Sequence, residues 1–304
     1  MATLALEKSV SFKNILVATD FSEASRHAAQ CAAAIATSNN AKLFLLNVVP
    51  PERHLADPVP PDFDREFTTA NHNLKALVAV ESLEALRHEN IVERGLVDEV
   101  VADVIRDKQI DLLVLGTHGR TGLRKLVLGS VAEELFRDAS CPVLTIGPTA
   151  PPVREIRRVL YVTDFGSASV HALPYAIDFA DKKSGELILL HLVPPIPVEY
   201  IGPFWYPGTD VIEREEADQQ NSLKKLRALL PSNKGLNCSV EHVVELHIPP
   251  EGIINFAKER NVDLIVMGIR ETGISSPRMT AHMPWAIAYE VVCGAECPVL
   301  TVRA

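Results

Sequence analysis

Short apolar runs rich in Val, Ile and Leu recur along the chain without strict alternation between apolar and polar residues. Three of them cover residues 15–18, 45–49 and 112–115. Runs of this length and composition are typical of strands that are buried on both faces of a parallel sheet. The pattern therefore predicts a parallel sheet with helices on both of its faces.

Stretches with helical spacing separate these runs. Residues 22–37 carry Ala, Ile and Cys on one stripe with Ser22 as N-cap, and the leucine spacing predicts one long helix over residues 64–89. The resulting order, β-α-β-α-β-α-β-α-β, predicts a five-stranded doubly wound sheet with right-handed crossovers. Ligands of such sheets bind outside the carboxyl ends of the strands.

The whole pattern occurs twice in the 304 residues. Four blocks recur in the same order, which indicates a duplication. The matching ranges are 15–22 with 159–166, 45–51 with 189–195, 111–116 with 263–268, and 141–145 with 297–301. The sequence therefore predicts an α/β protein of two tandem doubly wound domains, residues 1–148 and 149–304, joined at the proline-rich stretch 147–152.

Composition narrows the function classes. The chain has 30 Lys and Arg against 39 Asp and Glu, a formal net charge of −9, which argues against a nucleic-acid partner. Five cysteines are too few for a disulfide scaffold and favour a reducing compartment. No signal peptide and no apolar run of membrane-spanning length is evident. A cytoplasmic protein without a membrane partner is the expectation.

A glycine-rich basic loop follows the fourth predicted strand of the first copy. It runs from Gly116 through Gly119 and Arg120 to Gly129 and Ser130, where a helix is predicted to begin and to continue to about residue 138. Glycines allow backbone amides to approach a phosphate, and a helix N-terminus supplies unpaired N–H groups with a partial positive charge. The alternative is that the glycines only form a turn and a helix cap.

The spacing Gly-x2-Gly-x9-Gly-Ser resembles the nucleotide-binding signature of the ATP-binding universal stress proteins. The strand that ends in Asp20 and the closing strand at residues 141–144 resemble that family too, and the likeness covers both copies. The resemblance implies an adenine nucleotide alpha hydrolase-like fold that binds ATP, with or without Mg²⁺. It also implies contacts of Asp20 and the backbone near Val48 with adenine, of Gly116 with the ribose, and of Gly119, Arg120, Gly129, Ser130 and Val131 with the phosphates.

The second copy keeps Asp164 at the position of Asp20 but has lost the glycine loop. Glu271 stands where the first copy has Gly119, and Trp285 stands where it has Gly129. A carboxylate repels phosphate and an indole fills the space of a glycine. We therefore expect ATP in the first copy only. The aromatic stretch 200–208 is expected to cover the vacated pocket or to form a partner surface.

Other candidate chemistry is weaker. Cys293 and Cys297 are weak evidence for a metal site and are better explained by packing in the core. No catalytic Ser-His-Asp or Cys-His set and no metal site is evident in the sequence. His118 could touch a phosphate or be a solvated loop residue. Asp20 is not expected to be a phosphoacceptor, because the neighbouring acidic pair and the lysine after the last strand that receiver domains need are missing. Glu133 and Glu134 could help to hold a metal ion or be ordinary first-turn carboxylates.

The function expected from this resemblance is a nucleotide-dependent stress-response regulator that forms a homodimer, as members of the family commonly do. The protein partner is open. Two alternatives remain: a slow ATP hydrolase or nucleotide-transfer enzyme, and a dimeric scaffold that binds no nucleotide.

Overall fold

The structure is a computed structural model that describes residues 10–50, 63–117, 128–147, 150, 155–196, 209–230, 235–270 and 285–304. These residues form two compact units, one of Ser11–Glu155 with Val292–Leu300 and the other chiefly of Ile156–Val291 with Thr301–Ala304. Because residues 148, 149 and 151–154 lie outside the described part, the expected domain boundary at 148/149 stays a prediction. No helix in the described ranges is both long and apolar enough to cross a membrane.

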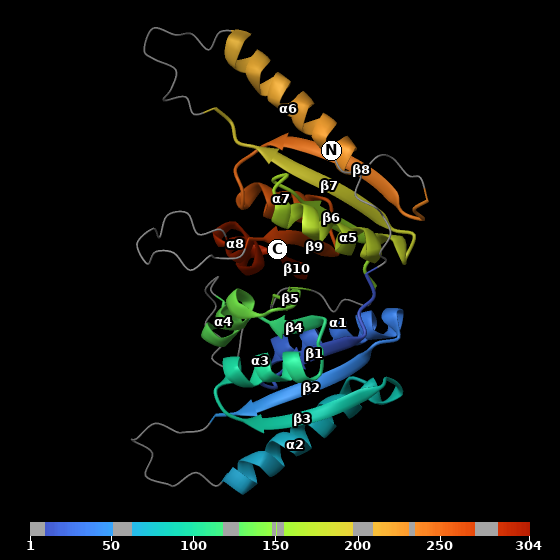
Figure 1. Cartoon of the computed structure of the whole chain (residues 1–304), viewed down its shortest axis with the longest axis vertical. Helices are drawn as coiled ribbons and strands as arrows, with labels where there is room; N and C mark the ends of the chain where they lie inside the picture. The colour runs from blue at the N-terminus through green and yellow to red at the C-terminus, as the bar shows by residue number, and fades with distance from the viewer. Residues whose placement is uncertain are drawn as a thin grey trace. The chain divides into compact units, whose positions relative to one another are not determined.

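The first repeat has the predicted alternation of strands and helices (Figure 1). Its strand order is β3-β2-β1-β4-β5, and the pairs β1/β2, β1/β4, β2/β3 and β4/β5 are all parallel. The sequence prediction of a doubly wound parallel sheet is confirmed. The elements are β1 (Asn14–Ala18), α1 (Glu23–Asn39), β2 (Lys42–Val49), α2 (Phe63–Val80), η1 (Leu83–Ala85), β3 (His88–Arg94), α3 (Val97–Asp107), β4 (Leu112–Gly116), α4 (Ser130–Asp138) and β5 (Val143–Ile146).

The second repeat has the same topology, with the strand order β10-β9-β6-β7-β8 and parallel pairs β6/β7, β6/β9 and β7/β8. Helix α5 packs on β6, β7 and β9, and α6 packs on β7 and β8. The elements are β6 (Arg158–Val162), α5 (Ser167–Asp181), β7 (Glu186–Val193), α6 (Thr209–Leu229), β8 (Ser239–Leu246), α7 (Glu251–Glu259), β9 (Leu264–Ile269), α8 (Ala286–Gly294) and β10 (Val299–Arg303).

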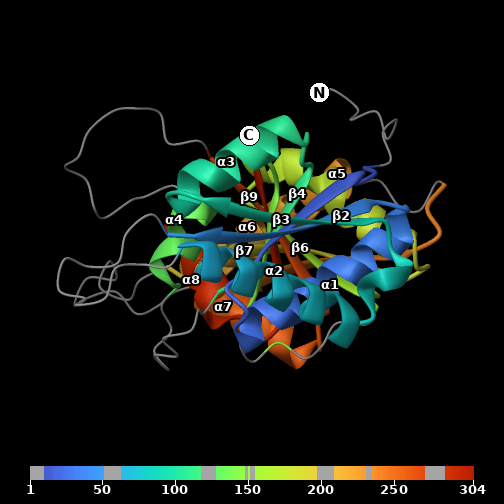
Figure 2. The same ribbon diagram turned by 90° about the horizontal axis from the view of Figure 1, so that it is seen from below.

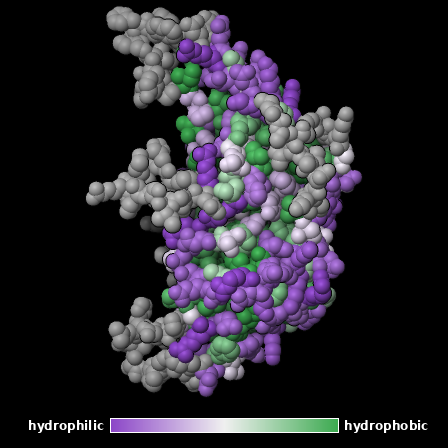
Figure 3. Space-filling model, in the orientation of Figure 1, coloured by the Kyte–Doolittle hydropathy of each residue, from purple (hydrophilic) through white to green (hydrophobic). Residues whose placement is uncertain are grey.

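Helices cover both faces of the first repeat's sheet, which explains the continuous apolar runs. Figure 2 shows α1 and α2 on one side of the strands and α3 on the other. One face of the strands packs with α3 and α4 in a core that includes Leu16, Leu46 and Leu113. Their sequence neighbours Ile15, Leu45 and Leu112 point to the other face and are also fully buried. Hydrophilic residues predominate on the surface seen in Figure 3, with hydrophobic ones scattered among them.

The first helix begins as predicted, but the second ends earlier than expected. Ser22 caps α1, and its side chain accepts a hydrogen bond from Ser25 N. The prediction of one helix over residues 64–89 is wrong beyond residue 80, because Ser82 adopts a left-handed conformation with φ of 54°. A short 3-10 turn and the edge strand β3 follow. Leucines at helical spacing therefore extend beyond the end of the helix.

The amino ends of the strands carry an ion-pair network in each repeat. In the first repeat, Glu89 on β3 accepts from Lys42 Nζ at 2.6 Å and from Lys108 Nζ at 2.7 Å. Both lysines also lie over the ring of Phe44. Hydrogen bonds from Lys108 and Lys42 hold the pKa of the Glu89 carboxyl below its usual value. The network ties β2 and β3 to the end of α3.

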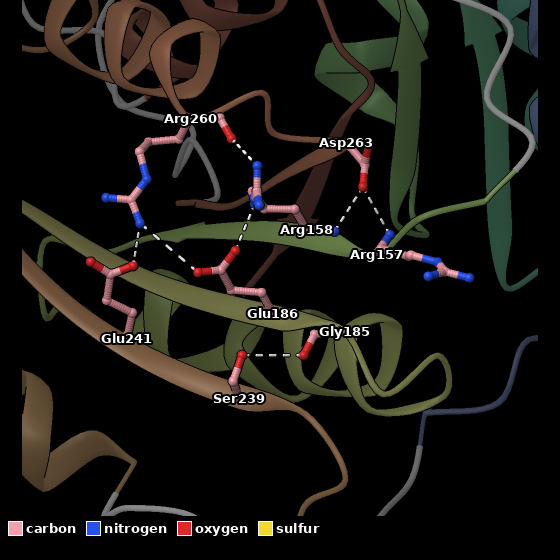
Figure 4. Close-up of polar contacts among 8 residues, drawn as sticks. All are labelled: Arg157, Arg158, Gly185, Glu186, Ser239, Glu241, Arg260 and Asp263. Carbon is pink, nitrogen blue, oxygen red and sulfur yellow. Dashed lines mark hydrogen bonds and ion pairs between the residues drawn. The ribbon is translucent and has the colours of Figure 1, made fainter.

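The second repeat has a polar network at the equivalent positions, and two of these positions carry a different charge (Figure 4). Arg158 Nε donates to Glu186 at 2.6 Å, and Arg158 Nη1 donates to the backbone oxygen of Arg260 at 2.5 Å. Arg260 in turn pairs with Glu241. Asp263 accepts from the backbone N–H of Arg158 at 2.7 Å, as Asp111 accepts from the start of β1 in the first repeat. The repeats thus share the positions of the network and two of its charges, since Glu241 corresponds to Glu89 and Arg260 to Lys108, whereas Glu186 replaces Lys42 and Arg158 replaces Asn14.

The network predicts a loss of stability when Glu89 is neutralised. We expect Glu89→Gln to lower the free energy of unfolding at pH 7 by about 1 kcal/mol, because half-exposed pairs are individually weak. The folded-state pKa lies below the unfolded one, so this stabilisation is present above about pH 5 and is lost as the pH falls through the folded pKa. Urea unfolding of both proteins from pH 7 to pH 3 measures the difference.

Asp103→Asn is the matched control, because Asp103 pairs with Arg106 on the exposed surface of α3. It should change the free energy of unfolding by less than about 0.5 kcal/mol at any pH in this range. Equal effects of the two substitutions would show that the Glu89 network contributes nothing particular.

Candidate functional site

Thr19, at the carboxyl end of β1, holds together the segments that surround the candidate site. Its N–H donates to Leu46 O at 2.9 Å, and its carbonyl accepts from Asn47 Nδ2 at 2.7 Å. Its hydroxyl donates to Ser25 Oγ at 2.9 Å and accepts from Phe21 N at 3.0 Å. The backbone of Thr19 is therefore bonded to the end of β2, and its buried side chain is bonded to the turn after β1 and to the first turn of α1.

Asp20 lies on the turn between β1 and α1. Its Oδ1 accepts from Ser22 N at 3.0 Å, and Phe21 between them has a positive φ of 65°. This short turn brings the carboxylate to the carboxyl edge of the sheet, where the sequence placed it. Val48 is half-buried near the end of the neighbouring strand β2, one residue beyond Asn47.

Gly116 ends β4 directly against the first turn of α1. A Cβ on Gly116 would lie 2.7 Å from the carbonyl carbon of Ala24 and 2.9 Å from Ser25 N. No side chain fits there without moving the helix. The glycine that the resemblance places beside the ribose therefore has a packing role of its own.

The start of α4 is fixed to the same edge. Gly129 N donates to Thr117 O at 3.0 Å, and Gly129 O accepts from Glu133 N at 2.8 Å. Gly129 is the N-cap, Ser130 is the first helical residue, and no side chain caps the helix. The amides of Ser130 and Val131 therefore have no acceptor within the helix and give the edge a partial positive charge.

The structure thus brings Asp20, Val48, Gly116 and the start of α4 to one edge of the sheet. Gly119 and Arg120 lie outside the described residues, as do His118, Arg124 and Lys125. Their expected contacts stay predictions. The hydrogen bond between Thr117 and Gly129 nevertheless brings the two ends of the predicted phosphate loop within contact of each other.

The second repeat has a matching set of hydrogen bonds around Thr163, and this set of bonds is called the frame in both repeats. Thr163 N donates to Leu190 O at 3.0 Å, and the hydroxyls of Thr163 and Ser169 lie 2.9 Å apart. His191 replaces Asn47 and donates from Nδ1 to Thr163 O at 2.7 Å. Phe165 has a φ of 63°, close to that of Phe21. The two repeats therefore share the backbone that shapes the edge.

The groups on this edge differ in the second repeat. Asp164 Oδ2 pairs with Arg270 Nη2 at 2.8 Å, while Oδ1 accepts from Ser169 Oγ at 2.7 Å and from Gly166 N at 2.8 Å. Burial acts to raise the pKa of the Asp164 carboxyl, but these hydrogen bonds and the Arg270 charge outweigh it and hold the pKa below its usual value. Asp164 is thus already engaged as an anion.

The other second-repeat candidates divide between described and undescribed residues. The ring of Trp285 makes an edge contact with Tyr289, one turn further along, with centroids 5.5 Å apart. Glu271 and the aromatic stretch 200–208 lie outside the described residues. The lid or partner surface expected for that stretch stays a prediction.

The cysteines take no part in the candidate site. None of the five is in a disulfide, four of them are buried, and burial raises the pKa of Cys31 and Cys141 to about 12. Thiols with such pKa values are poor nucleophiles at neutral pH. Within the described ranges, no group of three or more His, Cys, Asp or Glu could hold a metal ion.

Comparison with known proteins agrees with this geometry. The universal stress protein family model matches residues 11–147 and again residues 155–303. The chain belongs to the universal stress protein family. The two matches cover the two repeats of this universal stress protein, so the tandem arrangement of two family domains is confirmed.

Relatives and solved structures extend the similarity. Universal stress protein Rv2623 of Mycobacterium tuberculosis is 28% identical over 270 residues, which is 85% of this chain and 87% of the relative. Universal stress protein A homolog 1 of Coxiella burnetii is 36% identical over 146 residues, 44% of this chain and 96% of the relative. The crystal structure of a universal stress protein from Archaeoglobus fulgidus covers 95% of this chain and 98% of its own, with a TM-score of 0.66 and 20% identity, and shares the fold.

Sequence reasoning missed three residues that shape the edge: Thr19, Ser25 and Arg270. The signal for the first two was present, because Thr163 and Ser169 repeat them at the same spacing of 144 residues as Asp20 and Asp164. Arg270 gave no such signal, because the equivalent position of the first repeat is occupied by a different residue, His118.

The close approach of α1 to β4 predicts that a single methyl group destabilises each repeat. We expect Gly116→Ala to lower the free energy of unfolding by about 1–3 kcal/mol, because the new Cβ overlaps backbone atoms of Ala24. Gly268→Ala should cost more, because its Cβ would lie 2.1 Å from Ala168 O. Denaturant unfolding with circular dichroism measures both, and a neutral effect of either substitution would contradict the packing argument.

Proposed function

We propose that this universal stress protein binds ATP in its N-terminal repeat only and acts as a nucleotide-dependent regulator of a stress response. The observation that carries the proposal is the start of α4. Its uncapped amides lie at the sheet edge that also holds Asp20, and its N-cap Gly129 is fixed there by Thr117. A helix N-terminus of this kind, following a glycine-rich loop, is suited to bind a phosphate.

In this proposal each site residue has a separate role. Asp20 and the backbone near Val48 hold the adenine, and Gly116 leaves room beside the ribose. The backbone of Gly119, Arg120, Gly129, Ser130 and Val131 holds the phosphates. The locally basic loop with Arg120, Arg124 and Lys125 adds positive charge in a chain whose net charge is −9. Mg²⁺ would enter with the triphosphate, since this ion is commonly bound through substrate phosphates.

Regulation by binding is preferred over catalysis because the described part of the edge offers no general base aimed at a bound water. Steady release of phosphate by the purified chain would instead favour the alternative of a slow ATP hydrolase. An extract of the denatured protein without any adenine nucleotide, together with no binding on titration, would favour the scaffold alternative. A cytoplasmic location and a homodimer also belong to the proposal, and light scattering tests the latter.

Gly129→Trp transfers the residue of the second repeat into the first and tests the phosphate site. We expect it to weaken ATP binding at least about 100-fold, because an indole at the N-cap blocks the approach to the first-turn amides of α4. Isothermal titration should give one ATP per wild-type chain and none per variant chain. The circular dichroism spectrum and unfolding midpoint of the variant show whether the domain still folds.

The reverse substitution, Trp285→Gly, is the matched control. It changes the equivalent position of the second repeat and should leave the stoichiometry at one ATP per chain. Two ATP per wild-type chain, or unchanged affinity in a folded Gly129→Trp protein, would contradict the assignment of the site to the first repeat.

A further inference from the structure

We propose that Arg270 is an internal ligand of Asp164, which closes the second repeat to adenine independently of the lost phosphate loop. The inference rests on the proposed function in one respect, namely that the equivalent edge of the first repeat receives the base. It names a specificity-determining residue that the comparison of the glycine loops did not reveal.

The hydrogen bonds and the backbone that shape this edge are intact in the second repeat. Thr163, Ser169 and Phe165 repeat the hydrogen bonds and the backbone conformation of Thr19, Ser25 and Phe21. Gly268 approaches Ala168 as Gly116 approaches Ala24. The second repeat therefore did not lose its edge through a collapse of the fold. Selectivity at this edge depends on the side chains placed on the frame.

Both oxygens of the Asp164 carboxylate already accept hydrogen bonds from within the protein. Arg270 Nη2 lies 2.8 Å from Oδ2, while Ser169 Oγ and Gly166 N lie 2.7 and 2.8 Å from Oδ1. A base that hydrogen-bonds to this carboxylate has to displace the guanidinium. Arg270 also carries its positive charge at the end of β9, the strand equivalent to β4, whose end lies beside the ribose in the proposed site of the first repeat.

Two positions beside this carboxylate differ between the repeats. The first repeat has Ser22 and His118 where the second has Gly166 and Arg270. A Cβ on Gly166 would lie only 3.0 Å from Arg270 Nη2. The same Cβ would lie 2.9 Å from Asp164 Oδ1, so the absence of a side chain at Gly166 favours the close contact of the carboxylate with the guanidinium. Gly166 also leaves α5 without a side-chain cap, whereas Ser22 caps α1.

The ion pair between Arg270 and Asp164 occupies the carboxylate but contributes little to the stability of the fold. The side chains of Arg270 and Asp164 are 60% and 58% exposed, and pairs this exposed contribute little to stability. Removing Arg270 should therefore leave the fold intact while it uncovers the carboxylate.

The test uses adenosine, which lacks phosphates and so reports on base recognition alone. In wild-type protein, adenosine should shift the backbone amide signals of Phe21, Ser22 and Ser25 and leave those of Phe165 and Ser169 unchanged in two-dimensional NMR. In Arg270→His, which restores the residue of the first repeat, the Phe165 and Ser169 signals should also shift. The affinity of the second repeat should rise at least about fivefold over wild type. Arg214→His, on the exposed surface of α6, is the control and should behave as wild type.

The two proposals fail in different ways. Absence of shifts at Phe21 and Ser25 in every protein contradicts base binding by the first repeat, whatever happens in the second. Absence of shifts at Phe165 and Ser169 in Arg270→His, or equal shifts there in wild type, overturns the role of Arg270. The double variant Ser22→Gly/His118→Arg builds the pair into the first repeat, and full adenosine affinity in that protein would also contradict the proposal.

Discussion

A threonine hydroxyl at the end of the first strand is the interaction on which the candidate site depends. Thr19 bonds to the first turn of α1 through Ser25 and to the end of β2 through Leu46 and Asn47. Without these bonds the turn that carries Asp20 would have no fixed position relative to Val48. The same hydroxyl stabilises the positive φ of Phe21 by accepting its N–H. Thr163 does the same in the second repeat.

Preservation of these hydrogen bonds allows side chains at the edge to differ between the repeats without a change of fold. The residues that shape the backbone, such as Thr19 and Gly116, have identical counterparts in Thr163 and Gly268. Of the residues at the edge, Asp20 is kept as Asp164, whereas Gly166 and His191 replace Ser22 and Asn47. Gly268 shows why a glycine of the nucleotide signature persists in a repeat that lost the others: helix packing requires it. A signature glycine is thus evidence of binding only where packing does not already demand it.

The sequence predicted the topology, the duplication and the cap at Ser22, because each of these depends on local spacing or on self-similarity. It failed after residue 80, since a left-handed Ser82 ends α2 while the leucines continue at helical spacing. It also could not predict the pairing of Asp164 with Arg270, which are 106 residues apart and meet only because β6 and β9 are neighbours. The helix start at Gly129 was predicted, but its anchoring by Thr117 required the structure.

The charged networks at the amino ends of the strands have a consequence for folding fidelity. Two similar repeats in one chain can exchange equivalent strands while they fold. Lys42 and Glu186 occupy equivalent positions on β2 and β7 but carry opposite charges. An exchange would place Glu186 beside Glu89 and Lys42 beside Arg158, and like charges at close range are unfavourable. It would also place Glu186 near Lys108 and Lys42 near Glu241, so the reversed charge makes the amino ends of the two second strands chemically distinct without excluding either strand from the other repeat.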